Sequence, residues 1–242
     1  MKRSLFLFVI GATVSSSLFA QTKTVASEVS VTPQTIMQKA ANATADAKTM
    51  ATVKDVLMEG EGEVMGNTIE VSSKVIVGSA YMFTLSAGGM EVSKEMVKDG
   101  KYSMANQGME KELNNEDKED LNRKTAYFAD AYVLTQKGYT FTYSGTEKVE
   151  GKDAYAVKVK TAAGREYTNY YDKESGLKVK ITREADAGPN GKIQVQTYYS
   201  DYKNVNGVMI PAHVKIDQGQ VVIEVTFKNI KVNSGLKADD FK

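Results

Sequence analysis

The chain has 242 residues, a formal net charge of +1 and no cysteine. Without cysteine it cannot form disulfides or thiolate metal sites, and it cannot carry lipid on an N-terminal cysteine. Its near-balanced charge, with no basic patch that interleaves aromatic residues, argues against nucleic acid as a partner.

The N-terminus predicts export. A cationic start at residues 1–3 is followed by an apolar run over 5–14 and by small residues up to Ala20. This pattern is typical of a signal peptide over residues 1–20, and it predicts a periplasmic protein. The run is shorter than the roughly 20 residues that span a bilayer, although a retained N-terminal anchor is the alternative. Residues 21–31 are polar and aperiodic, so we expect a flexible mature N-terminus before a single domain at 32–242.

A helix is expected next, from about residue 33 to 47. Thr32 and Pro33 form a typical helix start, with threonine as N-cap and proline in the first turn. From residue 53 the period changes to that of strands, and most pieces end at glycine. The expected strands lie within 53–66, 67–78, 79–89, 90–100 and 101–108.

A second helical insertion is expected between residues 110 and 133, where apolar side chains recur at helical spacing. Strands then return to the end of the chain. They lie within 139–150, 153–162, 165–172, 177–186, 192–205, 208–217 and 220–232. The two sets predict a mostly β (α+β) protein with one strongly curved antiparallel sheet. This sheet would be an incomplete β-barrel of about 11–12 strands covered by helices, because a flat sheet of that size is disfavoured.

Few residues in the chain suggest catalysis, so we expect a protein that is not an enzyme and needs no cofactor or metal. His213 is the only histidine, which excludes zinc hydrolase motifs by count. Glu59, Glu61 and Glu63 alternate along one strand, and we expect them on the wet face of the sheet. The acidic run at 116–120 is interpreted as a solvated helix start.

The first set of strands is rich in methionine, which suits a surface that fits a flexible apolar guest. An ordinary packed core is the alternative interpretation. If the sheet is half-closed, its hollow face would instead bind a ligand, since a short helix cannot fill it. The residues expected to line that hollow are Met58, Met65, Met82, Phe83, Leu85, Met96, Phe141, Tyr143, Tyr155 and Val157.

Three segments of the second set resemble bacterial LolA-like proteins, which include the outer membrane lipoprotein-sorting proteins. They are GKDAYAVKV at 151–159, YYDKESGL at 170–177 and YSDYKNVNGVMIP at 199–211. The resemblance covers roughly the last hundred residues, and the first half is similar only in layout. Lipoprotein carriers of this family latch a helical lid with an arginine on an early strand. This chain departs from that pattern, because no arginine stands between Arg3 and Arg123.

The resemblance implies a half-barrel fold and a carrier function. Such a protein would hold a lipid acyl chain, or the lipid moiety of a lipoprotein, between the curved sheet and the helices. Its partners would be those acyl chains and a membrane-associated donor or acceptor protein, and we expect a monomer. The alternative function is a non-enzymatic protein–protein interaction module of the cell envelope, in which the hollow is only core.

Overall fold

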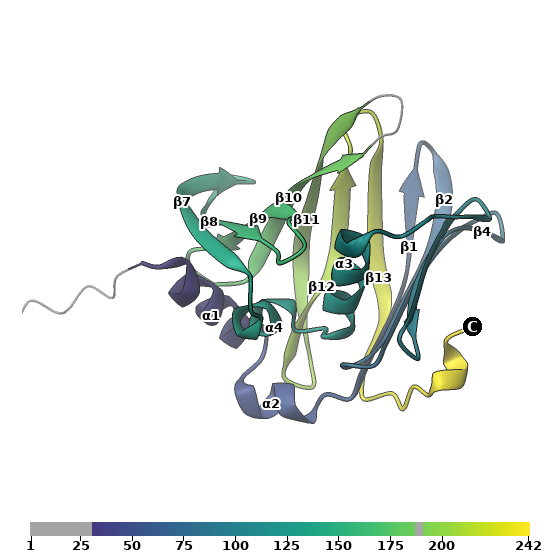
Figure 1. Ribbon diagram of the computed structural model, residues 1–242, viewed down its shortest axis with the longest axis horizontal. Helices are drawn as coiled ribbons and strands as arrows, with labels where there is room; N and C mark the ends of the chain where they lie inside the picture. The colour runs from purple at the N-terminus through teal and green to yellow at the C-terminus, as the bar shows by residue number, and fades with distance from the viewer. Residues whose placement is uncertain (1–30, 187–190) are drawn as a thin grey trace, which may run out of the picture. The chain divides into compact units, whose positions relative to one another are not determined.

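Thirteen strands form one antiparallel sheet in the computed structural model, which describes residues 31–186 and 191–242 (Figure 1). The expected signal peptide at 1–20 and the segment 21–30 lie outside these ranges. So do residues 188–190 of the turn at 188–191 that is expected between the strands within 177–186 and 192–205. Within the described ranges, no helix has the length and apolar character that a membrane crossing requires.

The strands form two meanders that meet in the middle of the sheet. The first comprises β1 (Asp55–Val64), β2 (Asn67–Ile76), β3 (Ala80–Ala87), β4 (Met90–Lys98), β5 (Lys101–Asn106) and β6 (Met109–Glu110). The second comprises β7 (Thr140–Val149), β8 (Lys152–Lys160), β9 (Glu166–Asp172), β10 (Lys178–Asp186), β11 (Lys192–Val205), β12 (Val208–Asp217) and β13 (Val222–Val232). Strand β1 pairs with β13, which leaves β6 and β7 as the edges of a sheet that does not close. The predicted fold class is confirmed, and the strand beyond the expected twelve is the two-residue β6.

The hairpin turns follow the expected glycine positions. At Met65-Gly66, Asp99-Gly100, Glu150-Gly151 and Asn206-Gly207, both residues of the turn have positive φ. Two consecutive residues with positive φ define the turn whose twist matches that of paired strands. Glycine at the second position meets this requirement without strain, which is why it recurs there.

The first helical segment is two helices rather than one. Helix α1 (Pro33–Thr44) begins as expected, and the Thr32 hydroxyl accepts a hydrogen bond from Thr35 N at 3.1 Å. The expected continuation to residue 47 is wrong, because Asp46 caps a separate helix, α2 (Ala47–Thr52). Its carboxylate accepts from Thr49 N at 2.8 Å, which favours a new helix start over continuation.

The second helical segment crosses a face of the sheet because its ends join opposite edges. The chain leaves β6 at one edge and re-enters at β7 at the other. Helices α3 (Asn115–Thr125) and α4 (Ala129–Thr135) occupy this crossing, with a break at 126–128 that the sequence pattern did not indicate. We call the face that these helices cover the inner face, and the opposite one the outer face.

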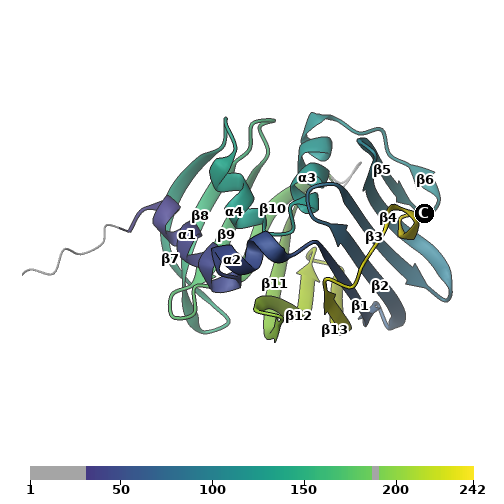
Figure 2. The same cartoon turned by 90° about the horizontal axis from the view of Figure 1, so that it is seen from below.

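The helices pack on different parts of the inner face (Figure 2). Leu121 of α3 is buried with Val75, Tyr81 and Val97 of the first meander. Helices α1 and α4 instead cover β8 and β9 of the second meander. Between them, the central strands, the α1–α2 link and Phe128 form the largest buried apolar cluster. The cavity described below lies beside this cluster.

Two glycines allow a close approach at the centre of the sheet. A Cβ on Gly60 would lie 2.4 Å from Thr226 O, and one on Gly62 would lie 2.0 Å from Glu224 O. Real Cβ atoms do not approach a carbonyl oxygen this closely, so only glycine fits at these positions. They bring β1 and β13 together where the two meanders join.

Candidate functional site

A cavity of approximately 290 Å³ lies between the helices and the inner face of the sheet. Its apolar wall combines the helical side with the central strands, and most of it is aliphatic, aromatic or thioether surface. The apolar wall is formed by Ala41, Met50, Met58, Phe128, Ala129, Ala131, Ile181, Met209, Pro211 and Val214. The polar residues of the wall are Thr44, Arg123, Tyr127, Asp130, Lys178, Tyr199 and Tyr202. A mostly apolar hollow with a few convergent polar groups is the usual form of a small-molecule site.

The link between α3 and α4 forms the roof of this cavity. Tyr127 has a φ of +54°, which is unusual for an aromatic residue. The turn is tightened by a hydrogen bond from Phe128 N to Ala126 O at 2.6 Å. The Tyr127 and Phe128 rings meet edge to face, with centroids 5.2 Å apart. Through this strained link, two aromatic side chains reach the cavity from consecutive positions.

An irregularity in β10 directs Lys178 inward. The pairing of β10 with β9 shifts register between Lys178 and Lys180. Lys178 consequently lines the cavity together with Ile181, three residues further on, although strict alternation would separate them. The Lys178 ammonium pairs with the Asp130 carboxylate at 2.8 Å. The Tyr171 hydroxyl donates to the same carboxylate at 2.8 Å, so Asp130 is anchored to the sheet.

A second irregularity, in β11, directs Tyr202 inward. Asp201 has a φ of +52°, and Tyr199 and Tyr202 both line the cavity although they are three residues apart. The Tyr202 hydroxyl donates to Lys178 O at 2.5 Å, which ties the two irregular strands together. Irregularities of this kind commonly reorient side chains beside binding sites.

Arg123, near the end of α3, supplies the second cation of the wall. It forms a hydrogen-bonded ion pair with Asp120, and its guanidinium lies 5.4 Å from the centroid of the Tyr167 ring. Burial would lower the pKa of Arg123, but the Asp120 carboxylate outweighs it and holds that pKa above its usual value. Burial would likewise raise the pKa of Asp120, but Lys124 and Arg123 hold it well below its usual value. The pair is therefore charged at neutral pH.

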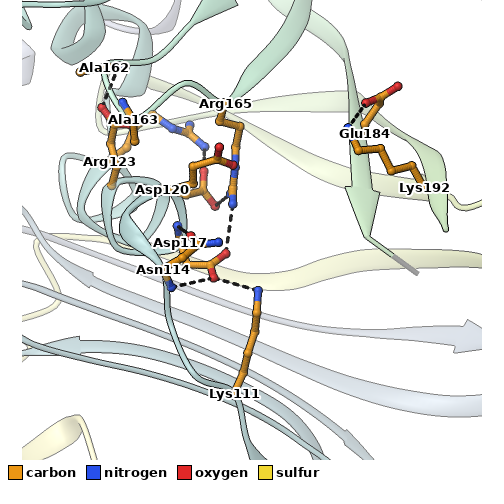
Figure 3. Close-up of polar contacts among 12 residues, drawn as sticks. Lys111, Asn114, Asp117, Asp120, Arg123, Ala162, Ala163, Arg165, Glu184 and Lys192 are labelled. Carbon is orange, nitrogen blue, oxygen red and sulfur yellow. Dashed lines mark hydrogen bonds and ion pairs between the residues drawn. The ribbon is translucent and has the colours of Figure 1, made fainter. Parts of the chain in front are cut away.

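An ionic cluster joins helix α3, whose Arg123 lines the cavity, to the β8–β9 link (Figure 3). The Arg165 guanidinium lies 3.0 Å from Asp117 Oδ1, 3.4 Å from Glu116 Oε2 and 3.6 Å from Asp120 Oδ2. The Glu119 carboxylate accepts from the backbone N–H groups of residues 162 and 163 in the same link. The acidic run at 116–120 is thus partly engaged with protein cations, and in this respect the expectation of a merely solvated helix start is incomplete.

Three of the expected lining residues lie where a ligand in the hollow could meet them. Met58 lines the cavity itself. Phe83 and Leu85 pack against the central apolar cluster on the same inner face. Contact of these three residues with a ligand stays a prediction.

Three of the four expected lining residues of the second meander lie in packed core instead. Val157 is fully buried with residues of α1 and α4, and Phe141 and Tyr155 pack against the same cluster. Tyr143 is 37% exposed and meets the Tyr155 ring edge to face. The inner-face assignment from alternation agrees with this packing, but α1 and α4 occupy the space that a ligand would need.

The assignment of Met65, Met82 and Met96 to the hollow is wrong. Met82 and Met96 are paired across β3 and β4 on the outer face, where they pack with the buried Phe241 near the C-terminus. Adjacent residues of a strand face opposite sides, so Met82 and Phe83 cannot line the same hollow. Met65 is at the tip of the β1–β2 turn and is 78% exposed.

None of the polar residues of the cavity wall was predicted from the sequence as a site residue. Lys178 and Tyr202 reach the cavity only through the two strand irregularities, which leave no mark in the period of the sequence. Tyr127 and Phe128 were counted within a continuous helix, although they form its interruption. A usable signal was topological: a segment that joins the two edge strands must cross the sheet, so its aromatic residues belong over the inner face.

Other groups with possible chemistry lie on the outer face. The Ser200 hydroxyl is 3.1 Å from His213 Nδ1, and Glu224 Oε2 is 3.8 Å from His213 Nε2. These are mid-strand positions whose backbone N–H groups serve the sheet, so they offer no oxyanion hole, and none of the three residues lines the cavity. Within the described residues, no group of three or more histidine, aspartate or glutamate side chains is placed to hold a metal ion.

Comparison with known proteins identifies the fold. No protein-family model matches the chain, and neither does any curated protein sequence. Among solved structures, a LolA superfamily protein from Nitrosomonas europaea aligns with a TM-score of 0.55 at 12% identity, over 88% of this chain and 98% of that one. A DUF1329 family protein from Desulfovibrio piger aligns with a TM-score of 0.54 at 12% identity, over 87% of this chain and 97% of that one. The chain therefore has a LolA-like fold.

Proposed function

We propose that this chain, whose fold is LolA-like, is a periplasmic carrier that binds an acyl chain in the cavity between the helices and the sheet. The observation that carries this proposal is the cavity, whose wall is mostly apolar and is roofed by a strained aromatic link. Burial of an acyl chain there is worth about 0.8 kcal/mol per CH₂, so useful affinity needs no specific polar contact.

The size of the cavity favours one acyl chain over several. Its volume of approximately 290 Å³ is near the lower limit of about 300 Å³ for small-molecule sites. Partly buried apolar residues of the inner face, among them Leu85 and Ile223, extend the apolar surface beyond it. The carrier would act as a monomer, taking lipid from and passing it to membrane-associated partners.

A cavity-filling variant tests this function. Ala131→Phe places an aromatic ring in the cavity wall, and we expect it to weaken binding of a fluorescent fatty acid at least tenfold. Ala47→Phe, at an exposed position of α2 outside the cavity, is the matched control and should bind as the wild type does. If the wild type does not take up the probe, or if both variants bind it equally well, the cavity is not the acyl site.

An interaction module is the second candidate, and it rests on β7. Among the strands that the structure describes, this ten-residue edge strand pairs only with β8, so its other side has no strand partner there. Such an edge can accept a strand from another protein. A stoichiometric protein partner that protects the β7 amides from exchange, recovered from the periplasm without lipid, would favour this candidate.

A further inference from the structure

The cavity has an incompletely satisfied cation in its wall. A guanidinium has five N–H donors, whereas Arg123 makes one hydrogen bond within the described residues, to Asp120. Its side chain is 17% exposed, and no Arg123 nitrogen is among the described atoms that are buried without a partner, so its remaining donors are accessible to a ligand as well as to water. The Asp120 carboxylate also forms ion pairs with the Lys124 ammonium at 3.4 Å and the Arg165 guanidinium at 3.6 Å, so its charge is shared among three cations.

Two tyrosine hydroxyls of the cavity wall add further donors. Tyr127 and Tyr199 line the cavity, and neither hydroxyl makes a hydrogen bond to another described residue. Burial raises the pKa of Tyr199 to about 12, while the charges of Arg123 and Arg183 oppose that rise. Both phenols are therefore protonated at neutral pH and can donate to an anion.

The charges of the wall favour an anion. Arg123 and Lys178 line the cavity, and each is paired with one carboxylate, that of Asp120 and that of Asp130 respectively. Arg183 follows Ile181 by two residues on β10, so it lies on the same inner face. It is exposed and forms no ion pair within the part of the chain that the structure describes. An uncompensated positive charge beside an apolar hollow attracts an amphiphile with a negative head.

We propose that the cavity selects single-chain amphiphiles with an oxyanion head, which Arg123 binds with help from the hydroxyls of Tyr127 and Tyr199. The acyl chain then lies along the apolar wall formed by residues such as Met58, Phe128 and Met209. This inference rests on the proposed function, and it narrows the ligand to a fatty acid or a lysophosphatidate. It makes Arg123 the residue that distinguishes an anionic head from a neutral one.

Titration calorimetry with three ligands of equal chain length tests the inference. The ligands are palmitate, palmitoyl lysophosphatidate and hexadecanol, which share the chain and differ in the head. We expect at least one anionic ligand to bind wild-type protein about 10- to 100-fold more tightly than hexadecanol, as charge-assisted hydrogen bonds allow. Its identity tells whether the carboxylate or the phosphate is the preferred source of the oxyanion.

Arg123→Met should remove this preference by weakening binding of the anionic ligand to about the level of hexadecanol. Asp120 keeps Lys124 and Arg165 as partners, so the variant does not strand a carboxylate. Lys124→Met is the matched control, because Lys124 shares Asp120 but does not line the cavity. It should keep the full preference. Tyr199→Phe, which removes only a hydroxyl, should reduce the preference in part.

The outcomes separate the two proposals. Equal binding of all three ligands by the wild type would overturn the selection for an oxyanion while leaving the acyl site intact. Loss of preference in Lys124→Met to the same extent as in Arg123→Met would also overturn the role of Arg123. Failure of every ligand to bind would overturn both proposals together.

Discussion

Gly60 and Gly62 of β1 allow the two meanders to pair closely, and single substitutions test whether glycine is needed there. Gly62→Ala puts a Cβ 2.0 Å from Glu224 O, a backbone atom that can move only with β13. We expect the free energy of unfolding to fall by about 1–3 kcal/mol, as for other overpacked sites. Urea denaturation measures this fall.

Gly66→Asn is the control for this substitution. A Cβ on Gly66 meets no atom within 4 Å, and asparagine tolerates the positive φ of 78°. Its effect should stay within about 0.5 kcal/mol. Equal stability of Gly62→Ala and Gly66→Asn would show that the close approach of β1 to β13 is not needed.

The alternation of side chains along a strand correctly predicted which face of the sheet a residue occupies where the strand is regular. It placed Val157 on the inner face, and that residue is fully buried there. It could not place Lys178 or Tyr202, because a bulge and a residue of positive φ invert the period within β10 and β11. Such irregularities arise from pairing with neighbouring strands, which the local sequence does not encode.

At the scale of elements, α3 depends on its ionic cluster with Arg165. Arg165→Met should lower the free energy of unfolding at pH 7 by about 1–2 kcal/mol, since the cluster is partly buried. Lys192→Met removes an exposed pair with Glu184, at the right of Figure 3, and should have almost no effect.

The contribution of this cluster should disappear in acid. Burial would raise the pKa of Asp117, but hydrogen bonds from Lys111 and Arg165 hold it below its ordinary 3.8, and Asp120 is lowered as well. A carboxylate with a lowered folded pKa stabilises above its unfolded pKa, and this contribution is lost as pH falls through the folded value. The difference between wild type and Arg165→Met should therefore narrow below about pH 4. An unchanged difference at pH 7 and pH 3 would contradict this origin.

The helical segments show why element boundaries were harder to predict than element types. The sequence pattern correctly predicted helices before and between the meanders. It missed the restart at Asp46 and the interruption at 126–128. The restart is made by a local cap, the hydrogen bond from Thr49 N to Asp46. The interruption goes with the packing of Phe128 into the central apolar cluster, so it follows from tertiary contacts rather than from helical period.

The outer face is expected to serve stability rather than binding. Phe241 is 1% exposed and packs against Met82 near Met96 and Leu236, on the face opposite the cavity. Phe241→Ala should lower the free energy of unfolding by about 3–5 kcal/mol. Fatty-acid affinity, measured by fluorescence titration of the folded variant, should remain that of the wild type. A matching loss of affinity would mean that the methionines of the outer face contribute to the ligand site after all.

For the molecule as a whole, the sequence predicted the sheet better than its contents. Turn glycines and the alternation of apolar and polar side chains predict a long meander. The shortage of catalytic groups favours a binding protein with a hollow face. The cavity itself depends on which face the α3–α4 crossing covers, and that choice is made by the packing of Leu121 and Phe128. The sequence prediction assigned Met58, Met65, Met82 and Met96 to the hollow because the first meander is rich in methionine. Of these four, only Met58 lines the cavity.

The central claim is that an acyl chain occupies the cavity, and anomalous X-ray scattering from a brominated ligand tests it most directly. Crystals grown with a terminally brominated palmitate should show a bromine peak enclosed by the apolar wall, near Met58, Phe128 and Met209. No peak there, or a peak only on the outer face near Met82, would contradict the account.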